Sequence, residues 1–299
     1  MNDRLSVAVT PEEDGAEVLT LLRKNLRLST ALLRRLKRVP DGILLDGMHV
    51  TVRARVRCGQ TLSILREPAG GERRVVPQQG PLNIVYEDDD LLILNKPNGI
   101  AVHPSPGHAE DTLANYVAAY LGEGAAFHAV NRLDRGTGGL MCVAKHKLSA
   151  QRLALQIQRG GLSRAYHAVV DGVGLPESGT IDFPIGRVTG NGIRRQVLEG
   201  GQAAITRYTR LAEGPSRTLL QLELETGRTH QIRVHMSHLG FPITGDFLYG
   251  KELPRLDGFA LCSVKLLLSQ PTTGAPLSFA IPDPGWFEQL LTEPGDCGI

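Results

Sequence analysis

An aspartate between two arginines is the feature of this chain with the clearest chemical potential. Asp134 lies in the sequence NRLDRGTGG, which spans residues 131–139. A carboxylate with a cation on each side stays ionised, so Asp134 is available as a nucleophile or as an orienting charge. The glycines that follow allow positive backbone φ angles and the close approach of a flat ligand. The pattern indicates a site, although Arg-Leu-Asp-Arg sequences are also common on solvated helix faces.

Three further segments favour the site. LNKPNGIAVHP at residues 94–104 lies upstream of Asp134, and RAYHAV at 164–169 and TGRTHQIRVHM at 226–236 lie downstream. In this order the four segments resemble the RluA-type pseudouridine synthases, and the resemblance covers roughly residues 81–290. The family isomerises specific uridines of structured RNA to pseudouridine. The resemblance therefore implies an RNA-modifying isomerase, with ribosomal RNA of the large subunit as the expected substrate.

The resemblance also implies roles for single residues. Asp134 matches the catalytic aspartate of the family, and Arg233 matches the arginine that pairs with it. Tyr166 matches a tyrosine that packs against the uracil and can take part in proton removal, since it offers a flat face and a hydroxyl. Without the resemblance, a surface or structural ion pair is the alternative for Arg233, and an isolated strand tyrosine such as Tyr166 is more often half-buried packing.

Other residues of the same segments are expected to contact RNA. Arg132 matches the position whose side chain fills the gap left by a flipped base, because a planar guanidinium can stack there and contact phosphate. We assign Asn131, Arg135 and Ile232 to substrate or RNA binding as well.

Two positions depart from the family pattern. The family usually has His where this chain has Asn131, and Ser where it has Gly138. Neither change affects the aspartate, the arginines or the tyrosine, so the departures bear on target identity. A non-catalytic RNA-binding or ribosome-assembly factor on the same scaffold is the alternative hypothesis.

Charge is distributed unevenly along the chain. The whole chain of 299 residues has a net charge of only +2, but residues 16–65 hold ten cations against three anions. This asymmetry favours a basic arm that meets nucleic acid.

Residues 1–65 resemble an alpha-L type RNA-binding domain. Two helices, within residues 16–26 and after a cap at Ser29 or Thr30, precede a small hairpin at 43–50 and an alternating segment at 52–56. The second helix carries a basic face, which we assign to RNA binding: Arg34, Arg35, Lys37 and Arg38. A dimerisation or packing module with a solvated basic helix is the alternative. Residues 66–80, rich in Gly, Pro and Gln, are expected to form a flexible linker.

Residues 81–299 are expected to form the catalytic domain that positions these side chains. Strands are predicted at 82–86, 91–95, 139–144, 165–170, 204–211, 218–224, 260–268 and 277–281, and helices at 111–121, 148–158 and 229–239. Strands outnumber helices and rarely alternate with them, which predicts an α+β fold with a mixed, mainly antiparallel sheet. Residues 186–192 are expected to form a hairpin turn, with Arg187, Arg194 and Arg195 available to RNA.

No cofactor or metal is expected. Isomerisation of uridine adds no group and changes no oxidation state, and the histidines at 230, 235 and 238 have an arginine among them and no nearby carboxylate or cysteine. The cysteines at 58, 142, 262 and 297 form no Cys-x-x-Cys pair, which favours reduced thiols. No apolar run is long enough to span a bilayer. We therefore expect a soluble, cytoplasmic protein that is a monomer.

Overall fold

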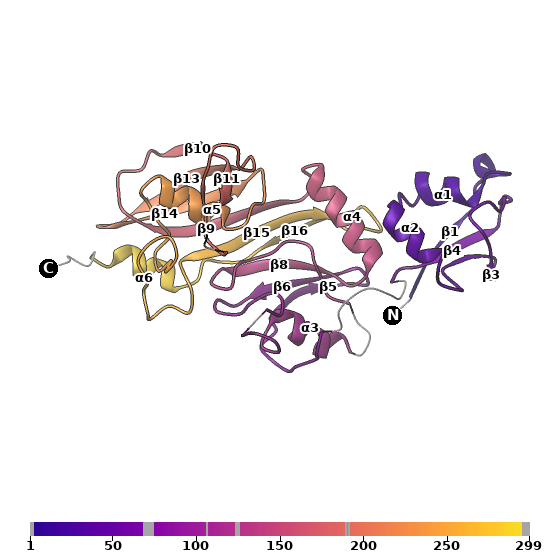
Figure 1. Cartoon of the computed structure of the whole chain (residues 1–299), viewed down its shortest axis with the longest axis horizontal. Helices are drawn as coiled ribbons and strands as arrows, with labels where there is room; N and C mark the ends of the chain where they lie inside the picture. The colour runs from indigo at the N-terminus through magenta and orange to yellow at the C-terminus, as the bar shows by residue number, and fades with distance from the viewer. Residues whose placement is uncertain are drawn as a thin grey trace.

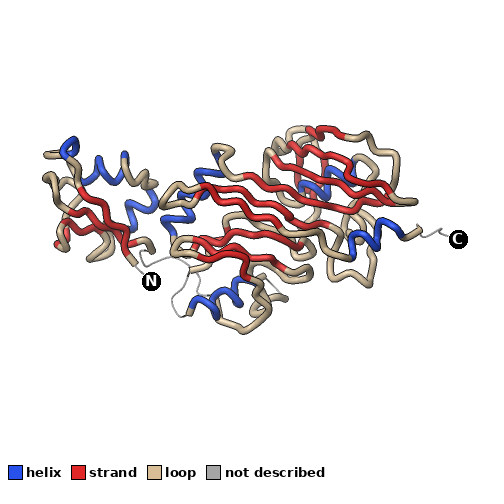
Figure 2. Tube along the Cα trace, turned by 180° about the vertical axis from the view of Figure 1, so that it is seen from behind, coloured by secondary structure: helices blue, strands red, loops and turns tan. Residues whose placement is uncertain are grey.

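The computed structural model describes residues 3–67, 75–105, 107–122, 126–188, 190 and 192–294. Within these residues the strands form one sheet of four, one of ten and one of two strands. Figure 1 shows the four-stranded sheet at one end of the molecule, with α4 between it and the ten-stranded sheet. Figure 2 shows the same arrangement from behind.

The N-terminal unit consists of the four-stranded sheet and the helices packed on it. The antiparallel sheet has the order β1 (Arg4–Ala8), β4 (Thr61–Leu65), β2 (Ile43–Leu45) and β3 (Met48–His49). A short 3-10 helix, η1 (Pro11–Glu13), precedes α1 (Val18–Lys24) and α2 (Thr30–Leu36). Both helices bury leucines against the sheet, and the Ser29 hydroxyl accepts the amide of Leu32 at 3.2 Å as the cap of α2.

The predicted helices and hairpin of this unit are confirmed, but the expected strand at 52–56 is wrong. The carbonyls of Val52 and Ala54 instead accept the amides of Leu19 and Val18, each at 2.9 Å. They thereby satisfy donors that the first turn of α1 leaves without an intrahelical partner. The strands β1 and β4 were not predicted.

The ten-stranded sheet confirms the α+β prediction. Its order is β10 (Ser178–Asp182), β13 (Ile205–Glu213), β14 (Arg217–Leu224), β9 (Ser163–Asp171), β15 (Leu261–Ser269), β8 (Gly138–Ala144), β6 (Leu91–Lys96) and β5 (Ile84–Glu87), with β16 (Pro276–Ala280) paired to β15 and β7 (His128–Ala129) to β8. Every pairing is antiparallel except that of β8 with β15. All eight strands predicted for this region are present. The strands β7 and β10 are additional.

Helices cover both faces of the sheet. The predicted α3 (Leu113–Leu121), α4 (Lys147–Gln158) and α5 (Gln231–His238) are present, and α6 (Trp286–Thr292) is additional. Successive residues of β8 face opposite sides, so Met141 packs in one cluster with α3 and α5 while Leu140 packs in another with α4. Every residue of β8 is therefore buried.

The predicted hairpin at 186–192 is also present. Strands β11 (Ile185–Arg187) and β12 (Arg195–Val197) pair antiparallel as the two-stranded sheet, and residues 189 and 191 lie outside the described residues. We call this hairpin the β11–β12 ribbon.

The N-terminal unit is docked directly on α4, in contrast to the expected flexible linker. The Gln151 side chain accepts the amide of Ser29 and donates to the carbonyl of Arg27, both at 2.8 Å. The Glu67 carboxylate accepts the amide of Lys147 at 2.6 Å, and Leu148 joins the hydrophobic cluster of the N-terminal unit. Of the expected linker, residues 68–74 lie outside the described residues, and 75–80 form no helix or strand.

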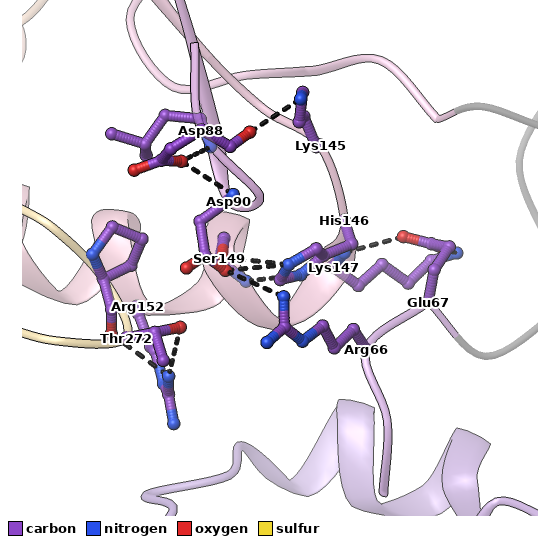
Figure 3. Close-up of polar contacts among 12 residues, drawn as sticks. Arg66, Glu67, Asp88, Asp90, Lys145, His146, Lys147, Ser149, Arg152 and Thr272 are labelled. Carbon is purple, nitrogen blue, oxygen red and sulfur yellow. Dashed lines mark hydrogen bonds and ion pairs between the residues drawn. The ribbon is translucent and has the colours of Figure 1, made fainter. Parts of the chain in front are cut away.

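A buried carboxylate organises the start of α4 (Figure 3). Asp90, only 2% exposed, accepts the Ser149 hydroxyl at 2.7 Å and forms ion pairs with His146 at 2.9 Å and Arg66 at 3.9 Å. Burial alone would raise the pKa of Asp90, but hydrogen bonds from His146 and Ser149 hold it well below its usual range. The cluster joins the end of the N-terminal unit to the large sheet.

None of the helices in the described part of the chain is long and apolar enough to cross a membrane. The thiols of Cys58, Cys142 and Cys262 are free, and Cys297 lies outside the described residues.

Candidate active site

Asp134 lies on the turn that leads from β7 into β8. The amide of Thr137 donates to the Asp134 carbonyl at 3.1 Å and closes the turn. Just beyond it, Gly139 lies opposite Ser263 in the parallel pairing of β8 and β15, with a φ of 101°. A Cβ on Gly139 would come within 2.3 Å of the Ser263 carbonyl oxygen, so only glycine fits. The turn is thus fixed to the middle of the sheet.

The side chain of Lys96 also holds the turn that carries Asp134. Its side chain is buried, and its Nζ donates to the carbonyls of Pro97 and Ile100 at 2.8 Å and of Arg135 at 3.1 Å. Burial lowers the pKa of Lys96 to about 7, although the charge of Asp134 raises it in part. Three carbonyl acceptors match the three donors of an ammonium group, so Lys96 links residues 97–100 to the Asp134 turn.

Arg233, on α5, joins Asp134 to a second carboxylate. Its Nη1 donates to Asp134 Oδ2 at 2.8 Å, while Nε and Nη2 donate to the two oxygens of Asp246 at 2.6 and 2.8 Å. Burial would lower the pKa of Arg233, but the hydrogen bonds to Asp246 and the charge of Asp134 raise it overall. Because the bidentate pair with Asp246 fixes the guanidinium plane, one N–H is directed at Asp134.

Aromatic rings complete the surroundings of Arg233. Its guanidinium carbon lies 4.3 Å from the ring centre of Phe259 and 4.9 Å from that of Tyr249. Cations are attracted to such ring faces. The side chain is thereby held by two rings as well as by two carboxylates.

His230 lies next to the carboxylate but contributes little charge. Its Nε2 is 3.8 Å from Asp134 Oδ2, and its Nδ1 is 2.8 Å from the Tyr249 hydroxyl. Burial lowers the pKa of His230, opposed in part by the charge of Asp134. The imidazole is therefore neutral near pH 7, and Arg233 is the ionic partner of Asp134.

Tyr166, on β9, forms the other wall of the site. It lies between Leu222 of β14 and Ser263 of β15 and is 4% exposed. Burial raises the pKa of Tyr166, so the phenol is protonated at neutral pH. The ring is thus a rigid, largely apolar surface with a hydroxyl in reach of the site.

The structure brings five of the predicted residues together. They line a recess of about 60 Å³: Arg132, Asp134, Tyr166, Ile232 and Arg233. The recess shares several of its lining residues with a wider cleft of about 900 Å³, which we call the Asp134 cleft. A carboxylate, a phenol and a fixed arginine at the edge of one cleft can act together on a flat, polar ligand.

Asn131 and Arg135 are not part of the recess, but both line clefts that Asp134 also lines. Asn131 is 2% exposed, and its side chain accepts the amide of Cys142 at 2.8 Å and donates to the carbonyl of Leu140 at 3.4 Å. These bonds continue the pairing of β8, so the Asn131 side chain supports that strand. Asn131 also lines the Asp134 cleft, and its contact with RNA stays a prediction. Arg135 is exposed and donates to the carbonyl of Gly99 at 2.8 Å, and it lines a second cleft of about 660 Å³ that Asp134 and Arg233 also line.

The basic residues of α2 are not brought next to Asp134. Arg34, Arg35, Lys37 and Arg38 lie on or just after α2, which Figure 1 shows beside α4, while α5 lies in the lobe around β13 and β14.

The glycine at 138 is coupled to Asn98. A Cβ on Gly138 would lie 2.1 Å from Asn98 Oδ1, and Asn98 Nδ2 donates to the carbonyl of Phe259 at 3.3 Å. The Asn98 side chain thus occupies the space that a larger residue at 138 would need.

Gly138→Ser is expected to destabilise the protein by about 1 to 3 kcal/mol, because Asn98 must move. In an Asn98→Ala background the same change is expected to cost less than about 0.5 kcal/mol. Urea unfolding of the four proteins of this double-mutant cycle measures the coupling. Equal costs in the two backgrounds would contradict the assignment.

Sequence reasoning missed Asp246, Tyr249 and Lys96. Asp246 and Tyr249 lie in the sequence GDFLYG at residues 245–250, between two glycines. An aspartate and an aromatic residue in a short glycine-bounded segment could have indicated a site, but nothing in the spacing identifies Arg233 as their partner.

The ring nitrogens of His235, in the middle of the histidine cluster, both have protein partners. His235 Nδ1 is 2.9 Å from Thr206 Oγ1, and its Nε2 is 3.0 Å from the Phe183 carbonyl oxygen. Among the described residues no group of three or more His, Cys, Asp or Glu side chains is arranged to hold a metal ion.

Comparison with known proteins gives the site a family context. Residues 90–238 match the family described as RNA pseudouridylate synthase. An uncharacterised RNA pseudouridine synthase of Bacillus subtilis, YhcT, is 41% identical over 72% of this chain and 73% of its own length. The ribosomal large subunit pseudouridine synthase D of Pseudomonas aeruginosa is 36% identical over 98% of this chain and 97% of its own.

Solved structures agree with these relatives. The human RNA pseudouridylate synthase domain containing 1 is 28% identical, with a TM-score of 0.59 over 68% of this chain and 84% of that one. The human RNA pseudouridylate synthase domain containing 4 is 25% identical, with a TM-score of 0.56 over 71% of this chain and 95% of that one. The fold of this chain thus has counterparts among solved pseudouridylate synthase domains.

Proposed function

The chain belongs to the RluA-type family of RNA pseudouridine synthases, and from that premise we propose that it isomerises specific uridines of large-subunit ribosomal RNA. The observation that carries the proposal is the Asp134 carboxylate at the edge of a cleft, held at 2.8 Å by an arginine that Asp246 fixes in turn. The residues that hold this carboxylate come from distant parts of the chain, so its position is set by the whole fold.

The reaction breaks the bond between N1 of uracil and C1′ of ribose and joins C5 to the same carbon. The hydrogen on C5 leaves and N1 gains one, so atoms and electrons balance without a cofactor. We propose that Asp134 initiates bond cleavage, that Arg233 positions it, and that Tyr166 packs against the uracil. To take part in removing the C5 proton, the Tyr166 phenol must first lose its own proton, which its raised pKa disfavours.

The target uracil must leave its base stack to reach Asp134, at a cost of a few kcal/mol. Arg132 is exposed at the recess and forms no hydrogen bond or ion pair with another described residue. We propose that its guanidinium enters the space that the flipped base leaves. Phosphate contacts along the RNA offset the cost of flipping.

We further propose that residues 1–65 form an alpha-L type RNA-binding domain whose contact face is α2. Arg34, Lys37 and Arg38 are exposed on this face, and docking on α4 holds the face at a set position relative to the large sheet. With α2 held at a set position relative to the active site, the protein would select RNA whose shape fits both α2 and the active site.

Replacing Arg34, Lys37 and Arg38 together by Gln is expected to weaken RNA binding about tenfold near 0.15 M salt. The slope of log affinity against log salt should fall by about two, because fewer counterions are released. Filter binding over a salt series measures both. The matched control replaces Arg53, Arg55 and Arg57, which removes the same charge from the same unit. Equal losses in both variants would contradict a specific role for α2.

The target assignment draws on the relatives that are named as ribosomal large-subunit enzymes. We also propose that the protein acts in the cytoplasm and as a monomer. The test is tritium release from unmodified transcripts labelled at C5 of uracil. Release from large-subunit ribosomal RNA is expected. Release from transfer RNA alone would overturn the ribosomal target, and no release from either, despite tight binding, would favour the non-catalytic alternative.

A further inference from the structure

A strongly basic recess lies beside the Asp134 cleft, between the β11–β12 ribbon and the loop before α5. Its volume is about 450 Å³, and three arginines line it: Arg187, Arg195 and Arg228. None of the described residues that line it is Asp or Glu. The remaining lining includes Gly200, where nothing lies within 4 Å of the position that a Cβ would take, so a ligand has room next to the backbone. The recess therefore has the charge and space for an anion.

Two of these cations directly oppose each other. Arg187 pairs with Arg195 in the register of the ribbon, and like charges at such positions destabilise a strand pair. Arg187 is exposed and forms no hydrogen bond or ion pair with another described residue. Arg195 Nη1 contacts backbone carbonyls of its own turn at 3.2 to 3.4 Å. Among the residues that the structure describes, no carboxylate forms an ion pair with Arg187 or Arg195, so an external anion could balance their charge.

The ribbon is hydrogen-bonded to a residue that packs against Arg233. The Arg195 amide donates to the Tyr249 hydroxyl at 2.8 Å, and the same hydroxyl contacts His230 next to Asp134. Arg228 donates from Nε to the carbonyl of Ala203 at 2.9 Å, and it lines both the basic recess and the Asp134 cleft. An anion in the recess would thus lie beside a ligand in the cleft.

We propose that the basic recess binds a backbone phosphate of the RNA next to the flipped uridine. This inference rests on the proposed function, since it names a contact of the same substrate. Guanidinium groups suit phosphate because they offer parallel N–H donors. The site would hold the RNA strand on one side of the target while the base enters the Asp134 cleft.

The test replaces Arg187 and Arg195 together by Gln in an Asp134→Asn background, so that binding is measured without turnover. The probe is an unmodified large-subunit ribosomal RNA transcript. The dissociation constant is expected to rise about tenfold near 0.15 M salt, and the salt slope to fall by about one. Replacing Arg187 and Arg195 by Lys keeps both charges, so the slope of log affinity against log salt should stay close to that of the wild type. Arg210→Gln removes a charge that is paired with Glu213 outside the recess, and it should change affinity less than twofold.

A purely structural role makes different predictions. If the arginines only support the ribbon, the Gln variant should unfold more easily than the wild type in the absence of RNA. Under our proposal the variant should be no less stable, because the replacement removes the repulsion between the two arginines. In the wild type, RNA should protect Arg187 and Arg195, but not Arg210, from phenylglyoxal. An unchanged salt slope with no protection would overturn the phosphate site even if tritium is released. Absence of tritium release with a reduced slope would instead overturn the proposed function and leave the phosphate site standing.

Discussion

Asp134→Asn is expected to lower the rate of pseudouridine formation by about four orders of magnitude or more, while RNA affinity changes less than about twofold. The amide has nearly the same shape, and its oxygen can still accept the Nη1 hydrogen of Arg233. It lacks the charge and the nucleophilicity that bond cleavage requires. Single-turnover tritium release measures the rate, and filter binding measures the affinity.

Asp89→Asn is the matched control for this loss. Asp89 is an exposed aspartate outside the clefts that adjoin Asp134, so the same chemical change there should leave the rate within about twofold of the wild type. If Asp134→Asn kept its rate within tenfold, the carboxylate would not be the reacting group. A matching fall in RNA affinity would instead give Asp134 a role in binding.

Asp134, Tyr166 and Arg233 could be predicted as one group because each lies in a segment that resembles the pseudouridine synthase family. The structure joins Asp134 and Arg233, which are 99 residues apart, by a hydrogen bond. Asp246 could not be predicted in the same way. Whether Asp246 meets Arg233 depends on which side of α5 faces the loop that carries Asp246. That orientation is set only once β9, β14 and β15 have paired, and no local pattern encodes it.

The fold was predictable where periodicity had one explanation. Alternation and apolar runs located the strands of the large sheet, since a buried strand needs such residues. At 52–56 the same alternation has another cause, because one side packs on the N-terminal cluster while the backbone bonds to α1. The composition of 66–80 suggested a free tether, but Glu67 and Gln151 fix the unit through polar contacts that composition does not reveal.

Asp246→Asn is expected to destabilise the protein by about 3 to 5 kcal/mol, because it leaves a buried arginine partly unpaired. Asp246 is fully buried and accepts two hydrogen bonds from Arg233 as well as the amides of Leu248 and Tyr249, at 3.0 and 3.2 Å. An asparagine has one acceptor oxygen, and its NH₂ group would face other donors. Urea unfolding measures the loss of stability.

The same variant should also slow catalysis about a hundredfold at a temperature where it stays folded, since a shift of about 1 Å in a positioning group has that effect. The loss should appear in the single-turnover rate and not in RNA affinity, because Asp246 acts through Arg233 and lies away from solvent. Glu213→Gln disrupts an ion pair with Arg210 at the surface and should leave both the urea midpoint and the rate close to those of the wild type. A stable Asp246→Asn protein with the wild-type rate would mean that Asp134 is positioned by other contacts, of which the Lys96 link to its turn is the strongest candidate.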